Sequence, residues 1–166
     1  MSTLKVGTIQ DPTNSNTAIS IDSSGQVTLG QKVGWLIGGT DGTSTITTSP
    51  VPWRTAIIDY QNGWNNTNKR YQVSVTGLYH IGFVMSSDDT VATWNLERST
   101  DGGSSYSFIK KVQQRKPAGG NTATYTHSII YPLNANDMLR VTTDGKGYYS
   151  WGTDLTWVQF WGFLIG

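Results

Sequence analysis

From residue 53 onward, short runs of apolar and β-branched residues alternate with turn-forming residues. The run Tyr71-Gln72-Val73-Ser74-Val75 changes between apolar and polar at every position, which is the two-residue period of a half-buried strand. No stretch keeps the ~3.6-residue period of an amphipathic helix for more than about two turns. The runs end at residues that favour tight turns, such as Asn62-Gly63 and Asp101-Gly102-Gly103. The pattern predicts an all-β chain, an antiparallel sandwich or jelly roll, with strands at residues 55–60, 71–75, 78–85, 91–98, 107–113, 122–131, 138–142 and 155–165.

The first 52 residues have a different pattern. Residues 1–29 contain two short alternating runs and a turn at Asp22-Ser23-Ser24-Gly25, which predict a strand and a hairpin. This segment has no aromatic residue and too little apolar area to fold alone, so we expect a β arm that lies on another surface. Residues 30–52 are rich in Gly, Ser, Thr and Pro and predict a linker with one apolar patch at 33–37. The expected domains are therefore an arm at 1–29, a linker at 30–52 and a head at 53–166.

Two of the predicted head strands carry apolar residues on both faces. Large apolar residues stand at both odd and even positions between 157 and 165, and residues 78–85 show a similar pattern. A sandwich of one chain covers only one face of each sheet. The second apolar face of these strands therefore predicts an interface between copies of this chain. The residues expected at this interface are Tyr79, Ile81, Phe83, Trp157, Phe160, Trp161, Phe163 and Ile165.

Charge and composition exclude several classes of protein. The chain has 12 basic and 11 acidic residues spread along its length, so it has no strong field to attract nucleic acid or an anionic membrane surface. It has no cysteine, which removes disulfides, thiolate metal sites and thiol nucleophiles. No apolar run approaches the ~18 residues that span a bilayer, and the first residues lack the apolar core of a secretory signal. We expect no nucleic-acid partner and no membrane insertion.

Candidate catalytic and ligand-binding residues are few. Because His80 falls in a strand that we expect to be covered, a core or interface imidazole is the favoured interpretation, and His127 is expected at the surface of a strand. The segment Asp101-Gly102-Gly103-Ser104-Ser105 fits either a cation-binding loop or a hairpin turn, and we favour the turn. None of the common hydrolase, metalloprotease or phosphate-loop motifs occurs. We therefore expect no enzymatic activity, no catalytic residues, no metal and no cofactor.

Two surface features leave alternatives open. The basic residues Lys110-Lys111 and Arg115-Lys116 fit a solvated edge strand, or a surface that binds an acidic capsid or polysaccharide. Aromatic residues in or beside loops, such as Trp64 and Trp151, fit packing under loops, or stacking on sugar rings. In both cases we favour the first interpretation, a solvated edge strand for the basic residues and packing under loops for the aromatic residues.

Three segments of the head carry a family resemblance. They are Tyr71–Ile81, where one strand ends at Gly77 and the next begins at Leu78-Tyr79, then Asn134–Val141, and then the closing run Phe160–Ile165. Together they resemble the globular head of complement component one q and its tumour-necrosis-factor-like relatives. The resemblance covers roughly residues 53–166. It implies a ten-strand jelly roll that associates as a tight trimer, with the last strand near the threefold axis.

The arm has a resemblance of its own. Leu4-Lys5-Val6-Gly7-Thr8-Ile9-Gln10, followed by Ala18–Val27, resembles the opening segment of many virion proteins of tailed bacteriophages. In such proteins an N-terminal β segment attaches to the particle and a trimeric head projects from it. The residues expected to anchor the chain are Leu4, Val6, Ile9, Ile19, Ile21, Val27 and Leu29.

These observations predict a non-enzymatic, homotrimeric decoration or cement protein of a phage head. The arm would bind the major capsid protein or a neighbouring virion protein by strand pairing, and three arms would add affinity multivalently. The alternative is a short tail fibre or receptor-binding tip that recognises a glycan on the host surface. The expected location is the virion, on the outer capsid or the tail, after assembly in the host cytoplasm. Copy number per particle separates the two roles, because cement requires hundreds of copies and a fibre tens or fewer.

Overall fold

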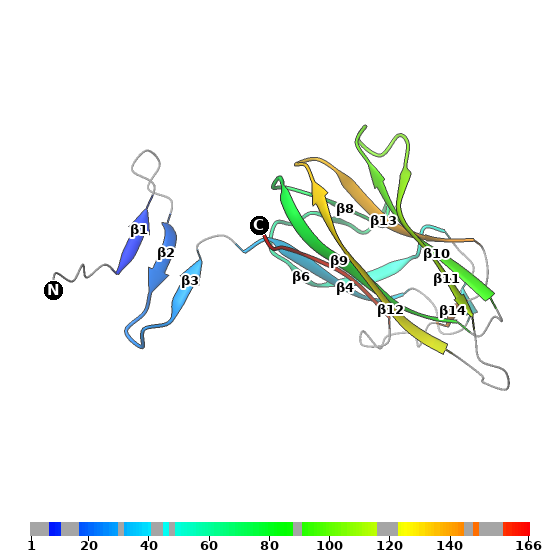
Figure 1. The fold of residues 1–166 in the computed structure, drawn as a ribbon, viewed down its shortest axis with the longest axis horizontal. Coiled ribbons are helices and arrows are strands. Elements are labelled where there is room, and N and C mark those ends of the chain that lie inside the picture. The colour runs from blue at the N-terminus through cyan, green and yellow to red at the C-terminus, as the bar shows by residue number, and fades with distance from the viewer. Residues whose placement is uncertain are drawn as a thin grey trace. The chain divides into compact units, whose positions relative to one another are not determined.

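A computed structural model describes residues 7–10, 17–29, 32–40, 45–46, 49–87, 91–115, 123–144, 148–149 and 158–166. The chain divides into two compact units, Met1–Lys32 and Val33–Gly166 (Figure 1). We call them the N-terminal unit and the head, and describe each by itself. Within the described residues, no helix is long and apolar enough to cross a membrane.

The N-terminal unit is a three-stranded antiparallel sheet in the order β1-β2-β3. Its strands are β1 (Thr8–Gln10), β2 (Thr17–Ile21) and β3 (Val27–Leu29). The turn between β2 and β3 is closed by Asp22, whose carboxylate accepts hydrogen bonds from the amides of Ser24 (2.8 Å) and Gln26 (2.9 Å). Gly25 supplies the positive φ that this turn requires, at 79°. The strand and hairpin expected for the arm thus join in one sheet.

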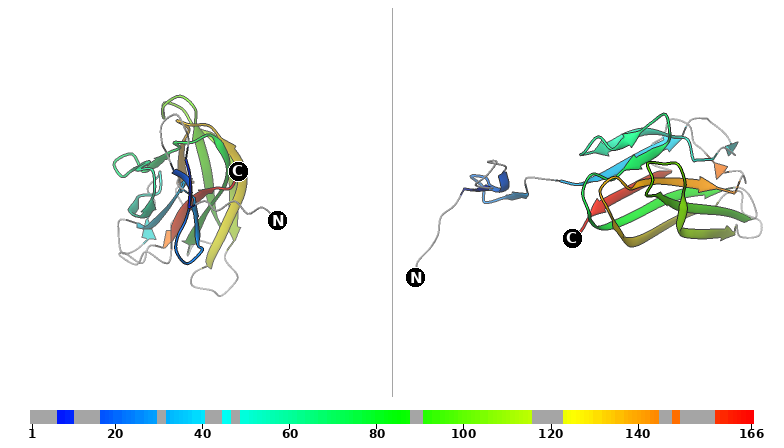
Figure 2. Two further views of the ribbon diagram at one scale, coloured as in Figure 1. Left: turned by 90° about the vertical axis from the view of Figure 1, so that its left-hand side faces the viewer. Right: turned by 90° about the horizontal axis from the view of Figure 1, so that it is seen from above.

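The head consists of two five-stranded antiparallel sheets, which Figure 2 shows as two layers. The first sheet, in the order β12-β9-β15-β4-β6, contains the last strand of the chain and is called the terminal-strand sheet here. The second, in the order β11-β10-β13-β8-β7, is called the hairpin sheet. The strands are β4 (Gly34–Thr40), β6 (Trp53–Asp59), β7 (Trp64–Asn65), β8 (Arg70–Gln72), β9 (Gly77–Ser87), β10 (Val91–Ser99), β11 (Ser107–Arg115), β12 (Ala123–Leu133), β13 (Met138–Thr143) and β15 (Gln159–Leu164), with β5 (Thr45–Ile46) and β14 (Tyr148–Tyr149) forming a separate pair.

Aromatic side chains join the two sheets of the head. The ring of Trp35 on β4 stacks on Tyr71 of β8 with centroids 3.9 Å apart, and it meets Phe160 of β15 edge-on at 5.6 Å. Trp53 of β6 stacks on Phe160 with ring centroids 6.1 Å apart. All four side chains are buried, so a few large rings fill much of the space between the layers. The all-β antiparallel sandwich predicted from the sequence is confirmed.

The expected linker at 30–52 is wrong for residues 34–40. These residues form β4, which is hydrogen-bonded between β15 and β6. Trp35 and Ile37 point into the core and are completely buried. Gly38 and Gly39, which suggested a loop, belong to this strand. Gly34, at its first position, leaves room for the ring of Phe163. The head therefore begins at Val33 and not at residue 53.

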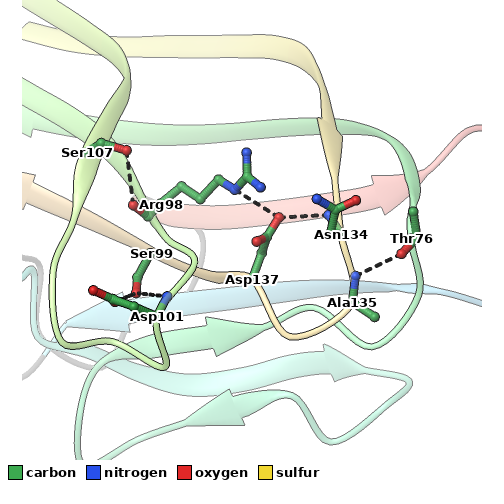
Figure 3. Close-up of polar contacts among 8 residues, drawn as sticks. All are labelled: Thr76, Arg98, Ser99, Asp101, Ser107, Asn134, Ala135 and Asp137. Carbon is green, nitrogen blue, oxygen red and sulfur yellow. Dashed lines mark hydrogen bonds and ion pairs between the residues drawn. The ribbon is translucent and has the colours of Figure 1, made fainter.

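A polar cluster fixes the end of the sandwich where β12 turns into β13 (Figure 3). The buried carboxylate of Asp137 pairs with Nε of Arg98 at 2.9 Å and accepts a hydrogen bond from the amide of Asn134 at 2.7 Å. The next amide, of Ala135, donates to the hydroxyl of Thr76 at 3.0 Å. These contacts join β10, the β12–β13 turn and the segment before β9, and so hold the strands of both sheets in register.

Candidate functional site

The outer face of the terminal-strand sheet, opposite the core, is the main candidate site. The register places one residue from each strand in a continuous row across this face. Directly opposite residues of antiparallel strands share a face of the sheet. The row, in sheet order, is Ser128, Gly82, Trp161, Leu36 and Ile58.

Two aromatic rings of β15 lie over glycines of the neighbouring strands. A Cβ at Gly82 of β9 would lie 2.7 Å from Cε2 of Trp161 and closer still to Cζ2. A Cβ at Gly34 of β4 would likewise overlap the ring of Phe163. The glycines therefore let both rings lie down on the sheet, where they remain half-buried, and the rings form a broad apolar surface.

Aliphatic side chains surround these rings. Ile130 of β12 is 58% exposed and Ile165, just after β15, is 52% exposed. Backbone hydrogen bonds fix the last residues of the chain against Leu78 of β9, whose own side chain is exposed. His80 is exposed and lies in register between Ile130 and Phe163. Val84, Leu36 and Ile58 are half-buried on the same face.

Four of the five strands of this sheet carry no charged residue, and the fifth, the edge strand β6, contains Arg54 and Asp59. β4, β9, β12 and β15 are fully described, and none of them contains Lys, Arg, Asp or Glu. The hairpin sheet differs, since β10 and β11 contain Glu97, Arg98, Lys110, Lys111 and Arg115. Charged side chains normally cover the exposed face of a sheet in a soluble monomer, so a large uncharged apolar face is typical of an association surface.

The predicted interface residues fall on both sides of the terminal-strand sheet. Trp161, Phe163 and Ile165 lie on its outer face, and Trp157 lies outside the described residues. The prediction is wrong for four residues, because they are buried in the core of a single head and no partner chain can reach them. These are Tyr79, Ile81, Phe83 and Phe160.

Sequence reasoning also missed residues that the outer face contains. The alternation along β9 and β15 showed two apolar faces, but not which of the two faced the core. A weak signal could have found these missed residues. Along β9, apolar residues such as Leu78 and Val84 occupy the positions between the core-facing ones. The missed residues of the outer face are Leu36, Ile58, Leu78, Val84 and Ile130.

The N-terminal unit has an apolar face of its own. Ile9 pairs with Ile19 and Ile21 pairs with Val27, so these four residues lie on one face of the sheet. Ile9 is 50% exposed and Val27 is 63% exposed, which leaves much of this face uncovered. Of the other expected anchoring residues, Leu4 and Val6 lie outside the described residues, as does the side chain of Leu29, whose backbone pairs with Ile19.

The Asp101 segment is a turn, as favoured from the sequence. Its carboxylate accepts hydrogen bonds from the hydroxyls of Ser105 and Ser99 and from the amides of Ser104 and Ser105. These hydrogen bonds, that of the Ser105 hydroxyl first, hold the pKa of the Asp101 carboxyl well below its usual range. Among the described residues, no group of three or more His, Asp or Glu side chains is placed to hold a metal ion.

His127 is half-buried on β12, an edge strand of the terminal-strand sheet. Its ring is nearly parallel to that of Tyr125, with centroids 6.3 Å apart, and lies 5.7 Å from that of Phe83. Burial, and to a lesser extent the positive charge of Lys110, lower the pKa of His127. These surroundings favour the neutral imidazole.

Comparison with known proteins concerns the head. No protein-family model and no curated protein sequence matches the chain. Among solved structures, the globular domain of zebrafish complement 1qA protein matches with a TM-score of 0.62 and 14% identity, over 81% of this chain and 98% of that one. The Eiger TNF of S. frugiperda matches with a TM-score of 0.60 and 13% identity, over 81% of this chain and 93% of that one. The head has the jelly-roll fold of these two proteins. The fold implied by the resemblance of residues 53–166 is thus confirmed.

Proposed function

We propose that this chain is a non-enzymatic, homotrimeric surface protein of a tailed-phage particle. The outer face of the terminal-strand sheet would join three heads, and the N-terminal unit would attach them to the head shell as a decoration or cement protein. The observation that carries the proposal is the apolar outer face, with Trp161 and Phe163 at its centre and no Lys, Arg, Asp or Glu in four of its five strands, β4, β9, β12 and β15.

Association through this face has a clear driving force. Apolar side chains such as Ile130 and Ile165 leave water when two heads meet, and no charge on these four strands opposes that transfer. Aromatic residues at the centre of a patch are typical of interface anchors. Threefold symmetry is supported by the resemblance of the head sequence to complement component one q and its relatives, and a closed ring of three copies satisfies every interface.

Attachment through the N-terminal unit rests on its uncovered apolar face and on its two edge strands, β1 and β3. Such edges accept a further strand from a partner. The proposed partner is the major capsid protein or a neighbouring virion protein. Three units on one trimer would strengthen weak individual contacts through multivalency. The resemblance of residues 4–27 to virion proteins supports this role.

The first test is the mass of the purified chain in solution. Sedimentation equilibrium at micromolar concentration should give three times 18.2 kDa. A monomer would overturn the association, and a dimer would overturn the threefold symmetry. The second test is electron microscopy of particles with the protein located: hundreds of copies on the shell support cement, whereas a few copies at the tail favour the alternative of a receptor-binding tip. Absence from the particle would overturn the virion role.

A further inference from the structure

The hairpin sheet carries a hollow that the proposed function does not use. The hollow has a volume of about 380 Å³ and opens beside β8, β13 and the turn between β10 and β11. Along β8 and β13, Tyr71, Leu139 and Val141 point into the core, so the neighbouring Arg70 and Arg140 point outward. The hollow therefore lies on the side of the sandwich away from the outer face of the terminal-strand sheet. It stays open whether or not the heads associate through that face.

The walls of the hollow are positively charged. Lys69, Arg70 and Arg140 line it, and none of its lining residues is Asp or Glu. Two carboxylates belong to the elements around the hollow without lining it. Glu97 contacts Nε of Arg140 at 2.7 Å and also accepts a hydrogen bond from Thr142 at 2.8 Å, and Asp101 lies in the turn that contains Gly103, where Ser99, Ser104 and Ser105 donate to it. Two carboxylates near three cations that line the hollow leave an excess of positive charge. A hollow of this kind attracts an anion.

The cationic side chains are held in place before any ligand arrives. The guanidinium carbon of Arg140 lies 3.6 Å from the ring centroid of Tyr106, while its Nε is fixed by Glu97. Arg70 reaches over Gly103, where a Cβ would lie 2.9 Å from its guanidinium carbon, and donates a long hydrogen bond of 3.4 Å to the carbonyl of Gly102. Gly103 has a φ of 90°, which glycine adopts without strain. The absence of a Cβ at this position also leaves room for the guanidinium of Arg70.

The loop before β8 adds polar groups. Lys69 donates to the carbonyl of Trp53 at 2.7 Å and to Oδ1 of Asn66 at 3.0 Å, and the amide of Asn68 donates to Oδ1 of Asn65 at 2.9 Å. The loop is thereby fixed to itself and to β6. Thr67 and Asn68, whose side chains carry a hydroxyl and an amide, line the hollow together with the arginines. These groups suit the hydroxyls of a sugar.

We propose that this hollow binds one saccharide unit that carries a carboxylate or phosphate group. Guanidinium groups bind such planar or tetrahedral oxyanions with paired hydrogen bonds, so Arg70 and Arg140 hold the acidic group. Asn68 and Thr67 contact the ring hydroxyls. The volume lies near the lower end of the range for small-molecule sites, which fits one sugar ring and not a long chain. The inference concerns a single head and stands independently of the virion role.

The test is binding of defined sugars to the full-length protein, followed by NMR chemical shifts of backbone amides. Glucuronic acid and glucose 6-phosphate should shift the amides of Asn68, Lys69 and Gly103 in a saturable way, and 500 mM NaCl should weaken binding. Glucose, which lacks the acidic group, should not saturate them. No shift with either acidic sugar, or equal affinity for glucose, would overturn the proposal. Equal affinity for inorganic phosphate would overturn the assignment of a sugar.

Matched variants locate the site. Arg70→Gln should weaken binding of glucuronic acid about tenfold or more, because one charged hydrogen-bonding group is lost. Arg54→Gln removes the same charge from an exposed position on β6 that does not line the hollow, and should leave affinity unchanged. If both variants lose affinity equally, general surface charge explains the binding and the proposed site is wrong. The amide shifts of the unmodified chain give the same answer should a variant not fold.

Discussion

The indole of Trp161 lies directly over Gly82, and it occupies the space where any larger residue would place its Cβ. The two residues are opposite each other in the register of β15 and β9. The same arrangement recurs between Phe163 and Gly34 on β4. The shape of the outer face of the terminal-strand sheet therefore depends on glycines in its strands as much as on its aromatic residues.

Replacing Gly82 with alanine should disturb this face. The new Cβ overlaps the indole and also lies 2.8 Å from the carbonyl oxygen of His127, so Trp161 must move. We expect a loss of about 1–3 kcal/mol in the free energy of unfolding and weaker self-association. Gly166→Ala is the control, because a Cβ there meets no atom within 4 Å. Denaturant titration and sedimentation velocity measure both effects, and unchanged association of Gly82→Ala would argue against this face as the interface.

A charge at the centre of the outer face should prevent association. Trp161→Asp would bury an unpaired carboxylate in the proposed interface, which costs several kcal/mol per interface. We expect a folded monomer, with the β-sheet circular dichroism of the unmodified chain. Phe108→Asp makes a similar change on β11 of the hairpin sheet, where the ring is 62% exposed, and this variant should remain a trimer. The choice of face is wrong if both variants sediment alike.

Removal of residues 1–32 should separate attachment from assembly. The head is a compact unit with both of its sheets intact from Val33 onward, so it should fold and form trimers without the N-terminal unit. Binding to particles should be lost, because the apolar face that includes Ile9 and Val27 is gone. Co-sedimentation with particles that lack the protein measures this. Undiminished binding of the shortened chain would contradict the anchoring role.

The lowered pKa of His127 predicts how stability depends on pH. In the unfolded chain His127 takes up a proton near its ordinary pKa of about 6.5, whereas the folded chain takes it up only at lower pH. The contribution of His127 to the free energy of unfolding therefore has its full value above pH 6.5. It declines as the pH falls toward the pKa of His127 in the folded chain. In denaturant titrations from pH 7.5 to 5, His127→Gln should lack this part of the decline. Parallel curves for the two proteins would reject the assignment to His127.

Loss of the carboxylate of Asp137 should destabilise the head. Asp137→Asn removes the ion pair with Arg98 and replaces one of the oxygens that fix the β12–β13 turn through the amide of Asn134. Because the carboxylate is buried, we expect a loss of about 1.5–3 kcal/mol in the free energy of unfolding. Thermal or urea unfolding measures this value. Asp144→Asn, at an exposed position after β13, is the comparison and should cost less; equal losses would argue that the cluster contributes little.

The sequence predicted most of the head strands, since their alternation and their turn residues act locally. It failed at β4, where Gly38 and Gly39 resemble loop residues unless the pairing of this strand with β15 and β6 is known. It also failed to separate Phe160, in the core, from Trp161, on the outer face, because an alternating pattern with aromatic residues on both sides does not identify the inner one. Contacts between distant segments decide that question.

The basic hollow shows the same limit more strongly. Arg70, Gly103 and Arg140 are far apart in the chain, and nothing in their local sequence relates them. Only the pairing of β8 and β13, and the position of the β10–β11 turn beside them, brings the three together. A site assembled by topology leaves no local pattern, whereas the Asp101 turn, which lies within five residues, could be interpreted directly.

The path of β4 has a mechanical consequence. β4 is the first strand of the head, and it is hydrogen-bonded on one side to β15 and on the other to β6. A force applied to the chain at residue 32 would act on a strand that is paired with a neighbour on each side. The backbone hydrogen bonds of both pairings would share this force and would not break one at a time. A chain anchored at that end would resist shear better than one anchored through a strand at the margin of the sheet.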